Sequence, residues 1–353
     1  MRGDPLLGSA GPAGDYVVGR PPAPMRPDVR VAEPAVAGSM SGGNRGRKAR
    51  RRLSRDGSLP YLLMAPAVLA ILLVQVVPML AAVAMSFLRL NQFTIADWTH
   101  APFIGFDNYG VVLGSWNVIS QALVRSFAVT LAYTVVVVGM SCLLGMLAAV
   151  FLADEVRGRR LFGSVFMIAF ALPSFCATIL WAFLFQPNGA VNAVFGSGLG
   201  LLPGDTFWFA GDRAFWAMCV NTLWRTWPFA FLMLLPAVQG ISHELQEAAR
   251  VDGASRWREF SSITFPLTRR IVLLVGLIIS FWTFNDFTTP YIMFSTAAPQ
   301  TADVLSLAIY RISFVNLNFG LGSALSLLMI TFLIGFSILY IRILRVDIGA
   351  QST

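Results

Sequence analysis

Six apolar stretches in this chain of 353 residues are each long enough to cross a lipid bilayer. A spanning helix needs about 20 mostly apolar residues, because the hydrocarbon core of a bilayer is about 30 Å thick. Helical structure is required there, since no water bonds the backbone inside the bilayer. We therefore predict an all-α polytopic membrane protein with six transmembrane helices, at about 61–88, 122–152, 161–185, 215–238, 271–294 and 322–343.

The charge of the chain fits lipid better than nucleic acid as a partner. Only 12% of its residues are charged, about half the share in a typical soluble domain. The net charge of +8 would suit nucleic acid, but the basic residues lie between apolar stretches and in one tail. They do not form an aromatic-interleaved face, so we expect membrane lipid and no nucleic acid.

The types of residue that carry most metal and nucleophilic chemistry are scarce. Three cysteines, all within apolar stretches, make no disulfide framework. The two histidines lie in different loops, and no cluster has the spacing of metal ligands. The sequence therefore predicts no metal site and no catalytic residues. These cysteines and histidines are Cys142, Cys176, Cys219, His100 and His243.

The single lysine of the chain excludes one way of using ATP. A phosphate-binding loop needs Gly-Lys followed by Ser or Thr. Lys48 instead follows Arg47. The chain is therefore expected to be a non-catalytic subunit with no cofactor, and any ATP must be bound and hydrolysed by a partner.

Residues 1–58 differ in composition from the rest. Up to Gly38, about a third of the residues are Pro or Gly, which favours disorder. Two interpretations stay open for the first 40 residues: a solvated tail, or a start site assigned upstream of Met40. The basic run at 45–52 can contact anionic lipid headgroups, and we expect it to anchor the first span on the cytoplasmic side.

The arginines predict the orientation of the spans. Seventeen Lys and Arg residues lie in the basic run at 45–55 just before the first span, in the second and fourth connections, and after the sixth span. Only four lie in the other three connections or at their edges. Cytoplasmic loops carry the excess of positive charge, so both termini are predicted to be cytoplasmic in a multi-pass protein of the cell membrane. The outward loops also carry interfacial aromatics, namely Trp98, Trp116 and Trp208.

Small residues and prolines recur in the predicted spans. Ser141, Gly145 and Ala149 repeat every four positions, which permits close approach of a second helix. Prolines survive in membrane helices where neighbours re-satisfy the freed backbone groups. Ordinary packing explains each of these residues taken singly. The prolines in or near spans are Pro66, Pro78, Pro173, Pro228 and Pro236.

The connection between the fourth and fifth spans, at about 241–270, predicts a surface helix-turn-helix. Ser242 is a good candidate for the first N-cap, and Leu245 shares a shallow helix face with two alanines. Gly253 supplies the stop or sharp turn. A second short helix is expected at about 255–263, anchored by Trp257 and Phe260, before Pro266 restarts the chain toward the membrane.

This connection resembles the EAA loop of binding-protein-dependent ABC permeases. The match is a spaced set of residues on the appropriate loop of a six-span chain, which is far more specific than one triplet. In that family the loop is the coupling helix that docks on the ATPase subunit. The matching residues are Glu247, Ala248, Ala249, Asp252, Gly253, Ala254, Phe260, Ile263 and Pro266.

Three further segments resemble the maltose and glycerol-phosphate class of these permeases, and the resemblance covers about 59–345. They are Trp224-Arg225 with Trp227-Pro228-Phe229, the run FWTFNDFTTPYIMF at 281–294, and IGFDNYG at 104–110. One departure is that Ala297-Ala298-Pro299 stands where the family often has Gly-Gly-Pro. This departure weakens a substrate assignment based on that loop.

The resemblance implies the fold and the partners. It implies a type I ABC importer permease fold over 59–345, flanked by the tail at 1–58 and a short cytoplasmic tail at 346–353. It also implies a second homologous permease, two ABC ATPase subunits and an extracytoplasmic solute-binding protein. Transport of a sugar or sugar-like solute by alternating access would follow.

Polar residues deep in two spans mark a candidate solute pathway. Arg225 lies about 15 Å into the fourth span at about 1.5 Å per residue, and Asn285 and Asp286 lie well inside the fifth. Charges at such depth usually face a bundle interior or a wet cavity. Two interpretations stay open: a solute pathway, or a structural Arg225–Asp286 pair. In the first, three tryptophans offer faces to sugar rings: Trp224, Trp227 and Trp282.

Two alternative functions remain open from the sequence. The first is an importer of glycerol-phosphate diesters or of another small polar solute. The second is a self-contained secondary transporter or channel, which would need no ATPase and would have no use for an EAA-type loop.

Overall fold

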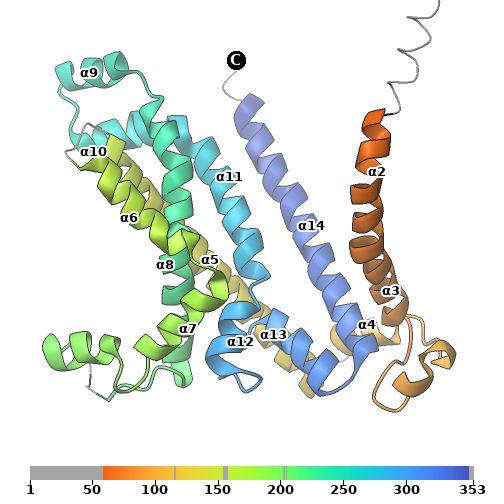
Figure 1. Ribbon diagram of the computed structural model, residues 1–353. Helices are drawn as coiled ribbons and strands as arrows, with labels where there is room; N and C mark the ends of the chain where they lie inside the picture. Colours follow the sequence, from red (N-terminus) through yellow and green to blue (C-terminus); the bar gives the residue numbers. More distant parts are fainter. Residues whose placement is uncertain (1–58, 115–116, 154–157, 202, 204, 350–353) are drawn as a thin grey trace, which may run out of the picture. The chain divides into compact units, whose positions relative to one another are not determined.

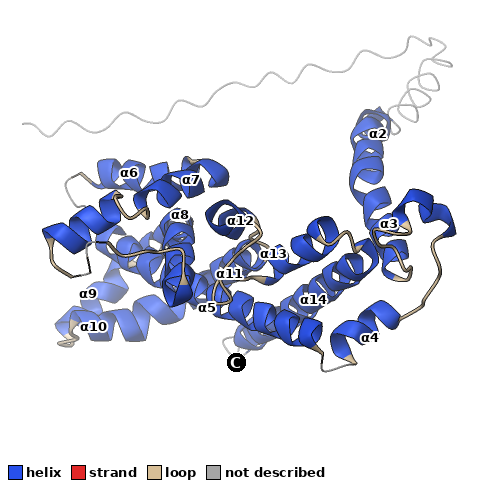
Figure 2. Cartoon of the chain, turned by 90° about the horizontal axis from the view of Figure 1, so that it is seen from below, coloured by secondary structure: helices blue, strands red, loops and turns tan. Residues whose placement is uncertain are grey.

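The computed structural model describes residues 59–114, 117–153, 158–201, 203 and 205–349. Helices make up nearly all of the regular structure (Figures 1 and 2), and among these residues the only strand-like pairing is an isolated β-bridge between Leu88 and Phe103. The expected tail at 1–58 lies outside the described residues, as do Trp116 and Arg157. Residues 1–66 and 67–353 form separate units, and the first contributes only the start of α2 to the description.

The helices confirm the all-α prediction, and their bounds refine it. The first half of the chain forms α2 (Leu59–Ile71), η1 (Leu72–Val76), α3 (Val77–Ser86), η2 (Ile95–His100), α4 (Asp107–Leu113), α5 (Val118–Ala153), α6 (Arg159–Ala171), α7 (Ser174–Leu184) and η3 (Asn192–Gly198). The second half forms α8 (Gly211–Gln239), α9 (His243–Val251), α10 (Arg256–Glu259), η4 (Phe260–Thr264), α11 (Phe265–Phe284), α12 (Thr288–Phe294), α13 (Leu305–Tyr310), η5 (Arg311–Val315) and α14 (Phe319–Gly349).

Length and hydropathy single out four described helical stretches that can cross a membrane. They are Leu63–Ser86, Val118–Ala153, Arg256–Phe294 and Phe319–Arg342, and a fifth appears if α6 and α7 count as one span. The helix of the fourth predicted span, α8, is long enough with 29 residues but is less apolar than these. The count of six therefore stays a prediction. α14 continues to Gly349, into the stretch expected as a tail.

The third predicted span is bent rather than straight. α6 and α7 meet at an angle of 95°. Leu172 between them is extended, with φ −70° and ψ 134°, because the ring of Pro173 disfavours helical backbone in the residue before it. The sequence points to this proline but not to the size of the bend.

The fifth predicted span is interrupted near its C-terminal end. α11 ends at Phe284, and α12 begins at Thr288 after three intervening residues. Unwound backbone at membrane depth is tolerated where it is buried in protein or lines a wet cavity. The short break at 285–287 therefore marks a place where the bundle is hollow or polar.

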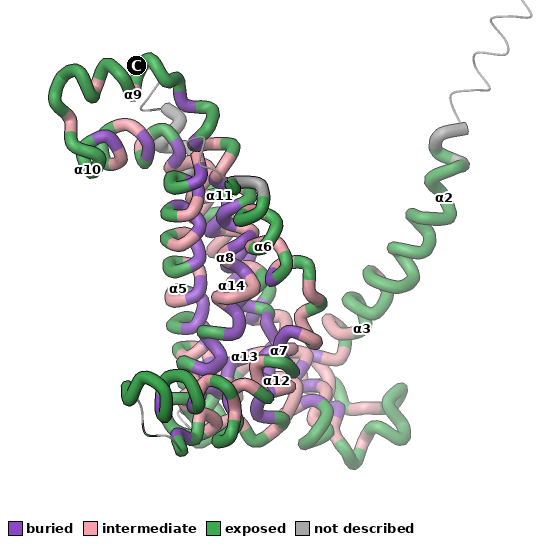
Figure 3. Tube along the Cα trace, turned by 60° about the vertical axis from the view of Figure 1, so that its left-hand side comes forward, coloured by how far each residue is buried: buried purple, intermediate pink, exposed green. Residues whose placement is uncertain are grey.

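The core forms where α5 packs along α8, with α11 against both (Figure 1). One side of α5 is buried along its length and the other is exposed (Figure 3). A Cβ on Gly145 would lie 2.6 Å from the Ala230 Cβ and 2.8 Å from the Phe231 nitrogen, so only glycine permits this approach. The Ser141 hydroxyl also lies 2.8 Å from that of Thr226. Close contact through this small-residue repeat is the packing predicted from the sequence.

The motif after the first span has a structural role. The Asn108 side-chain amide is buried and donates to the carbonyls of Ser86 (2.8 Å) and Leu88 (3.1 Å). The Tyr109 hydroxyl donates to the Ser86 Oγ at 2.8 Å. The Gly320 N–H at the start of α14 donates to the Leu90 carbonyl at 3.0 Å. These bonds satisfy the backbone where α3 ends, and they tie it to the last helix.

Candidate functional site

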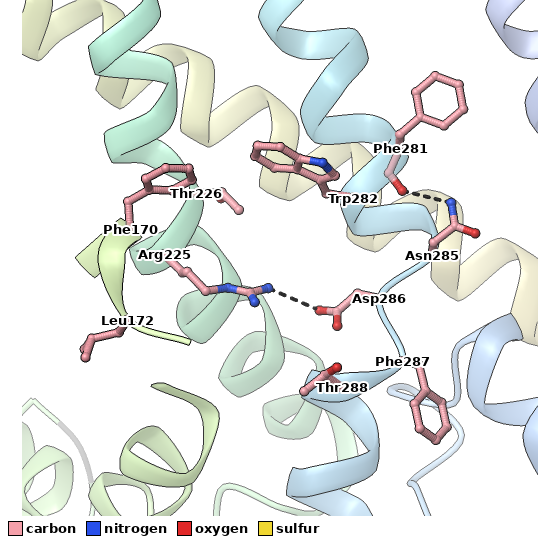
Figure 4. A pocket seen from close by; sticks show the side chains of 10 residues that line it. All are labelled: Phe170, Leu172, Arg225, Thr226, Phe281, Trp282, Asn285, Asp286, Phe287 and Thr288. Atoms are coloured by element: carbon pink, nitrogen blue, oxygen red, sulfur yellow. Dashed lines mark hydrogen bonds and ion pairs between the residues drawn. The ribbon is translucent and has the colours of Figure 1, made fainter. Parts of the chain in front are cut away.

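A cavity of about 660 Å³ opens beside the break between α11 and α12 (Figure 4). That volume lies within the range of small-molecule sites, about 300–1,000 Å³. The lining residues combine aromatic side chains with one guanidinium, one carboxylate and one amide. They come from α6, the link between α6 and α7, α8, α11, the break and the start of α12: Phe170, Leu172, Arg225, Thr226, Phe281, Trp282, Asn285, Asp286, Phe287 and Thr288.

Asp286 is held in place by three donors other than arginine. The Tyr133 hydroxyl donates to its Oδ2 at 2.9 Å and the Thr222 hydroxyl at 3.4 Å. The Thr289 backbone N–H at the start of α12 donates to its Oδ1 at 3.1 Å. Hydrogen bonds to the charged form stabilise a buried carboxylate. Asp286 therefore joins α5, α8 and α12 where the fifth span is broken.

Arg225 approaches the same carboxylate without bonding to it. Its Nη2 lies 3.9 Å from the Asp286 Oδ2, which is beyond hydrogen-bonding distance. No described residue accepts a hydrogen bond from its buried Nε. In Figure 4 the guanidinium points into the cavity toward Asp286. Arg225 is the middle residue of α8, about 21 Å from either end of that helix at about 1.5 Å per residue. Its donors are thus available to a bound molecule.

One of the three predicted tryptophans lines the cavity. The Trp282 ring lies 4.7 Å from the Phe229 ring and 6.3 Å from that of Phe170, and its residue is 45% exposed. Trp224 and Trp227 flank Arg225 but point elsewhere, since each helical residue is rotated by about 100° from the last. The Trp224 ring packs 6.0 Å from Trp181, and the Trp227 ring 4.7 Å from Phe166.

Asn285 sits between two hollows. Its side-chain amide donates to the Phe281 carbonyl at 2.9 Å, which satisfies a backbone acceptor where α11 ends. It lines the cavity just described and a second, more apolar one of about 380 Å³ between α11 and α14. Its amide is thus the polar boundary between the two spaces.

The residues of the predicted coupling loop lie on an open surface. No described residue of α9 is buried, and Glu247 and Ala248 are exposed while Ala249 is half-buried. The side chain of Ser242, the predicted N-cap, makes no capping bond. The helix-turn-helix itself is present, with α9 followed by α10.

The turn of this loop has the predicted geometry. Gly253 has φ +78°, a left-handed conformation that glycine adopts at no steric cost. The Gly253 N–H donates to the Arg250 carbonyl (3.0 Å) and the Ala254 N–H to the Ala249 carbonyl (2.9 Å), while Asp252 ends the helix. This pair of bonds is a Schellman turn, which satisfies the last carbonyls of α9.

The second arm of the loop runs directly into the membrane helix. The Ser255 side chain caps α10 by accepting from the Arg258 N–H at 3.3 Å. The rings of Trp257 and Phe260 lie 5.7 Å apart. Ile263 is half-buried in η4, and Pro266 lies in the first turn of α11. α10, η4 and α11 therefore form one continuous helical path.

An ion pair that the sequence did not reveal joins the two arms. Arg250 Nε lies 3.1 Å from Glu259 Oε2, and Arg250 Nη2 lies 3.0 Å from Oε1. The sequence does contain a feature that could have predicted this ion pair: Arg250 and Glu259 carry opposite charges and lie nine residues apart on either side of Gly253. The donors to Asp286 were also missed, since Tyr133 is separated from it by 153 residues and carries no charge to mark it.

The described residues contain no group of three or more His, Cys, Asp or Glu side chains able to hold a metal ion.

Comparisons with known proteins agree on one family. The model of the family described as "Binding-protein-dependent transport system inner membrane component" matches residues 141–346. The chain is 33% identical to the diacetylchitobiose uptake system permease protein DasB of Streptomyces coelicolor, over 90% of this chain and 93% of that protein. It is 28% identical to the trehalose/maltose transport system permease protein MalF of Thermococcus litoralis, over 82% and 95%.

A solved structure shows that the fold is that of an ABC importer permease. The chain matches a subunit of a bacterial ABC transporter involved in the import of the acidic polysaccharide alginate, with a TM-score of 0.66. The match covers 84% of this chain and 98% of that one, at 21% sequence identity.

Proposed function

Because the chain belongs to the family of binding-protein-dependent transport system inner membrane components, we propose that it forms the translocation pathway of an ATP-driven ABC importer for a sugar or sugar-like solute. The observation that carries the solute assignment is the cavity at the break between α11 and α12. It places the free donors of Arg225 beside the exposed face of Trp282.

A carbohydrate suits this pairing of groups. Its hydroxyl oxygens can accept from the Arg225 guanidinium, and the apolar face of its ring can lie on Trp282. Asp286 is occupied by Tyr133, Thr222 and Thr289, so it balances the charge of Arg225 rather than binding solute itself. The names of the two relatives, which refer to diacetylchitobiose and to trehalose or maltose, support the same class of solute.

The energy for transport would come from other subunits. The chain has no P-loop lysine, so ATP would be hydrolysed by two ABC ATPase subunits. The open surface of α9 would dock on one of them. A second homologous permease and an extracytoplasmic solute-binding protein would complete the importer, and closure of the ATPases would open the cavity outward.

Both termini would lie in the cytoplasm, as the arginine distribution predicts. In a variant without native cysteines, a single cysteine at Asn91 should react with an impermeant thiol reagent in intact cells. A cysteine at Ser242 or Ser255 should react only after the cells are broken. The reverse pattern would contradict the orientation.

The proposed function is tested by reconstituting the importer in nanodiscs. We expect disaccharide-loaded binding protein to stimulate ATP hydrolysis by the complex, and no hydrolysis by the purified chain alone. Stimulation by a glycerol-phosphate diester instead would correct the solute class. Robust ATP turnover by the isolated chain, or uptake that needs no ATPase, would contradict the assignment to an ABC importer.

A further inference from the structure

The α9 helix buries little of its surface against the described part of the chain. No described residue of α9 is buried, and its apolar residues Leu245 and Val251 are 45% and 87% exposed. α9 packs on α10, which follows it directly in the chain. Apolar burial therefore does little to fix the direction in which α9 points.

The Arg250–Glu259 pair supplies the missing constraint. Two parallel N–H···O bonds join the guanidinium to the carboxylate, at 3.1 and 3.0 Å. Such bidentate pairs fix geometry as well as adding stability. Glu259 is the only buried residue of α10, and its side chain is 11% exposed, whereas that of Arg250 is 57% exposed. The buried Glu259 carboxylate therefore holds the last turn of α9 against α10 through its ion pair with Arg250.

The helix that holds Glu259 leads to the cavity. From Arg256 the chain is helical through α10, η4 and α11 as far as Phe284. Glu259 and Phe281 are 22 residues apart, about 33 Å at about 1.5 Å per residue. Phe281 and Trp282 line the cavity, and Asn285 and Asp286 follow at the end of α11. A helical path thus connects α10 to one wall of the cavity.

We propose that Arg250 and Glu259 are positioning residues that lock α9 to α10, so that movement of α9 is passed along α11 to the cavity. The Schellman turn at Gly253 sets the path of the chain between the arms, and the ion pair sets their mutual angle. This inference rests on the proposed function, because it assumes that a partner moves α9.

The first experiment measures the angle in the chain itself. Spin labels on exposed Glu244 and Ser262, in a variant without native cysteines, report the distance between α9 and η4 in nanodiscs. We expect a narrow distance distribution that broadens in Glu259→Gln and stays narrow in Arg258→Ala, a control on the exposed face of α10. An unchanged distribution in Glu259→Gln would overturn the proposal.

The second experiment measures coupling in the assembled importer. Glu259→Gln and Arg250→Ala should keep the ATPase bound and keep basal hydrolysis, while solute uptake per ATP falls about fivefold or more, the usual scale of coupling between sites. The exchanged pair, Arg250→Glu with Glu259→Arg, should recover a large part of the uptake. Normal uptake in both single variants, or no recovery in the exchanged pair, would overturn the proposal.

Two outcomes separate this inference from the proposed function. Loss of the ATPase from the purified single variants would assign the pair to docking and overturn its role in transmission. If the unaltered complex transports no solute tested, the proposed function fails, and the distance measurement alone then decides whether the pair fixes α9.

Discussion

Two of the arginine–carboxylate pairs in the described part of the chain lie in opposite settings. In the bundle interior, Arg225 and Asp286 approach to 3.9 Å, with side chains 19% and 6% exposed. On the surface loop, Arg250 and Glu259 bond at 3.0 Å, with side chains 57% and 11% exposed. The buried pair is loose and the more exposed pair is tight. This is the reverse of what burial alone would suggest, since low dielectric strengthens attraction between charges.

The difference follows from what else each carboxylate contacts. Asp286 already accepts from Tyr133, Thr222 and the Thr289 backbone. Its geometry is therefore set without arginine, and Arg225 is left to face the cavity. For Glu259, Arg250 is the partner that joins it to another helix. The interior arginine is thus suited to binding, and the surface arginine to holding two helices together.

The largest expected effect is that of Asp286→Ala. It removes the acceptor of three donors and leaves Arg225 uncompensated, and breaking a buried pair from one side costs about 3–5 kcal/mol. The amount of protein in the membrane and its thermal stability in detergent should both fall sharply. Glu259→Ala should cost much less, because the Arg250 that remains is more than half exposed. Equal losses in the two variants would remove the contrast between the pairs.

Arg225→Ala should separate binding from assembly. Among the described residues no hydrogen bond is lost, and Asp286 keeps its three other donors, so the assembled complex should form in normal amounts. Uptake should fall about tenfold or more, since hydrogen bonds from charged donors are worth about 1.5–3 kcal/mol. Arg225→Lys keeps the charge but not the fork of donors and should recover only part of the uptake.

The opposite result would favour a purely structural pair. In that case Arg225→Ala would lower the amount of complex, and the double change of Arg225 and Asp286 would be better assembled than Asp286→Ala alone. A complex unaffected by Arg225→Ala in both assembly and transport would contradict both interpretations.

Gly145→Ala tests how tightly the interior is packed around the loose pair. The new methyl would meet Ala230 at 2.6 Å and backbone at 2.8 Å, so α5 and α8 must separate. Overpacking of this kind typically costs about 1–3 kcal/mol. Gly139→Ala on the same helix is the matched control, because no atom lies within 4 Å of its added Cβ. Thermal unfolding in detergent should show a loss for the first variant only.

Gly253→Val should have the smallest effect on stability and a clear effect on coupling. Open space surrounds the added side chain, so the cost is that of the left-handed backbone, about 1–2 kcal/mol. The protein should reach the membrane at near-normal levels but retain its ATPase poorly or couple hydrolysis poorly to uptake. Gly253→Asn should be milder, because asparagine tolerates this conformation. Normal uptake by Gly253→Val would exclude the loop as the coupling element.

The sequence predicts well those features that depend on local composition. The helices were predicted from apolar stretches, and the left-handed turn was predicted from Gly253. Each of these features depends on a segment of about 20 residues or fewer. The 95° bend at Pro173 was not predicted, since membrane helices often pass through a proline without breaking. The size of a bend depends on what packs against it.

The sequence predicted three polar residues of the cavity and one of its aromatic residues, Trp282. Arg225, Asn285 and Asp286 stand out because polar groups are costly in lipid, and they do line one cavity. Their neutral neighbours could not be inferred, because the hydroxyl of Tyr133 is brought to Asp286 from 153 residues away. Trp224 and Trp227 pack against Trp181 and Phe166 instead of lining the cavity, because each helical residue is rotated by about 100° from the last. The sequence alone does not fix which side of α8 faces the cavity.

The length of α5 bears on the kind of membrane this protein can occupy. Its 36 residues extend about 54 Å at about 1.5 Å per residue, far beyond a hydrocarbon layer about 30 Å thick. Even at a tilt of about 40°, the upper end of what is observed, the helix would still reach across about 41 Å. Sterol-like lipids or longer acyl chains thicken the bilayer. The α5 helix is therefore long enough to span such a thicker bilayer without any change in its length.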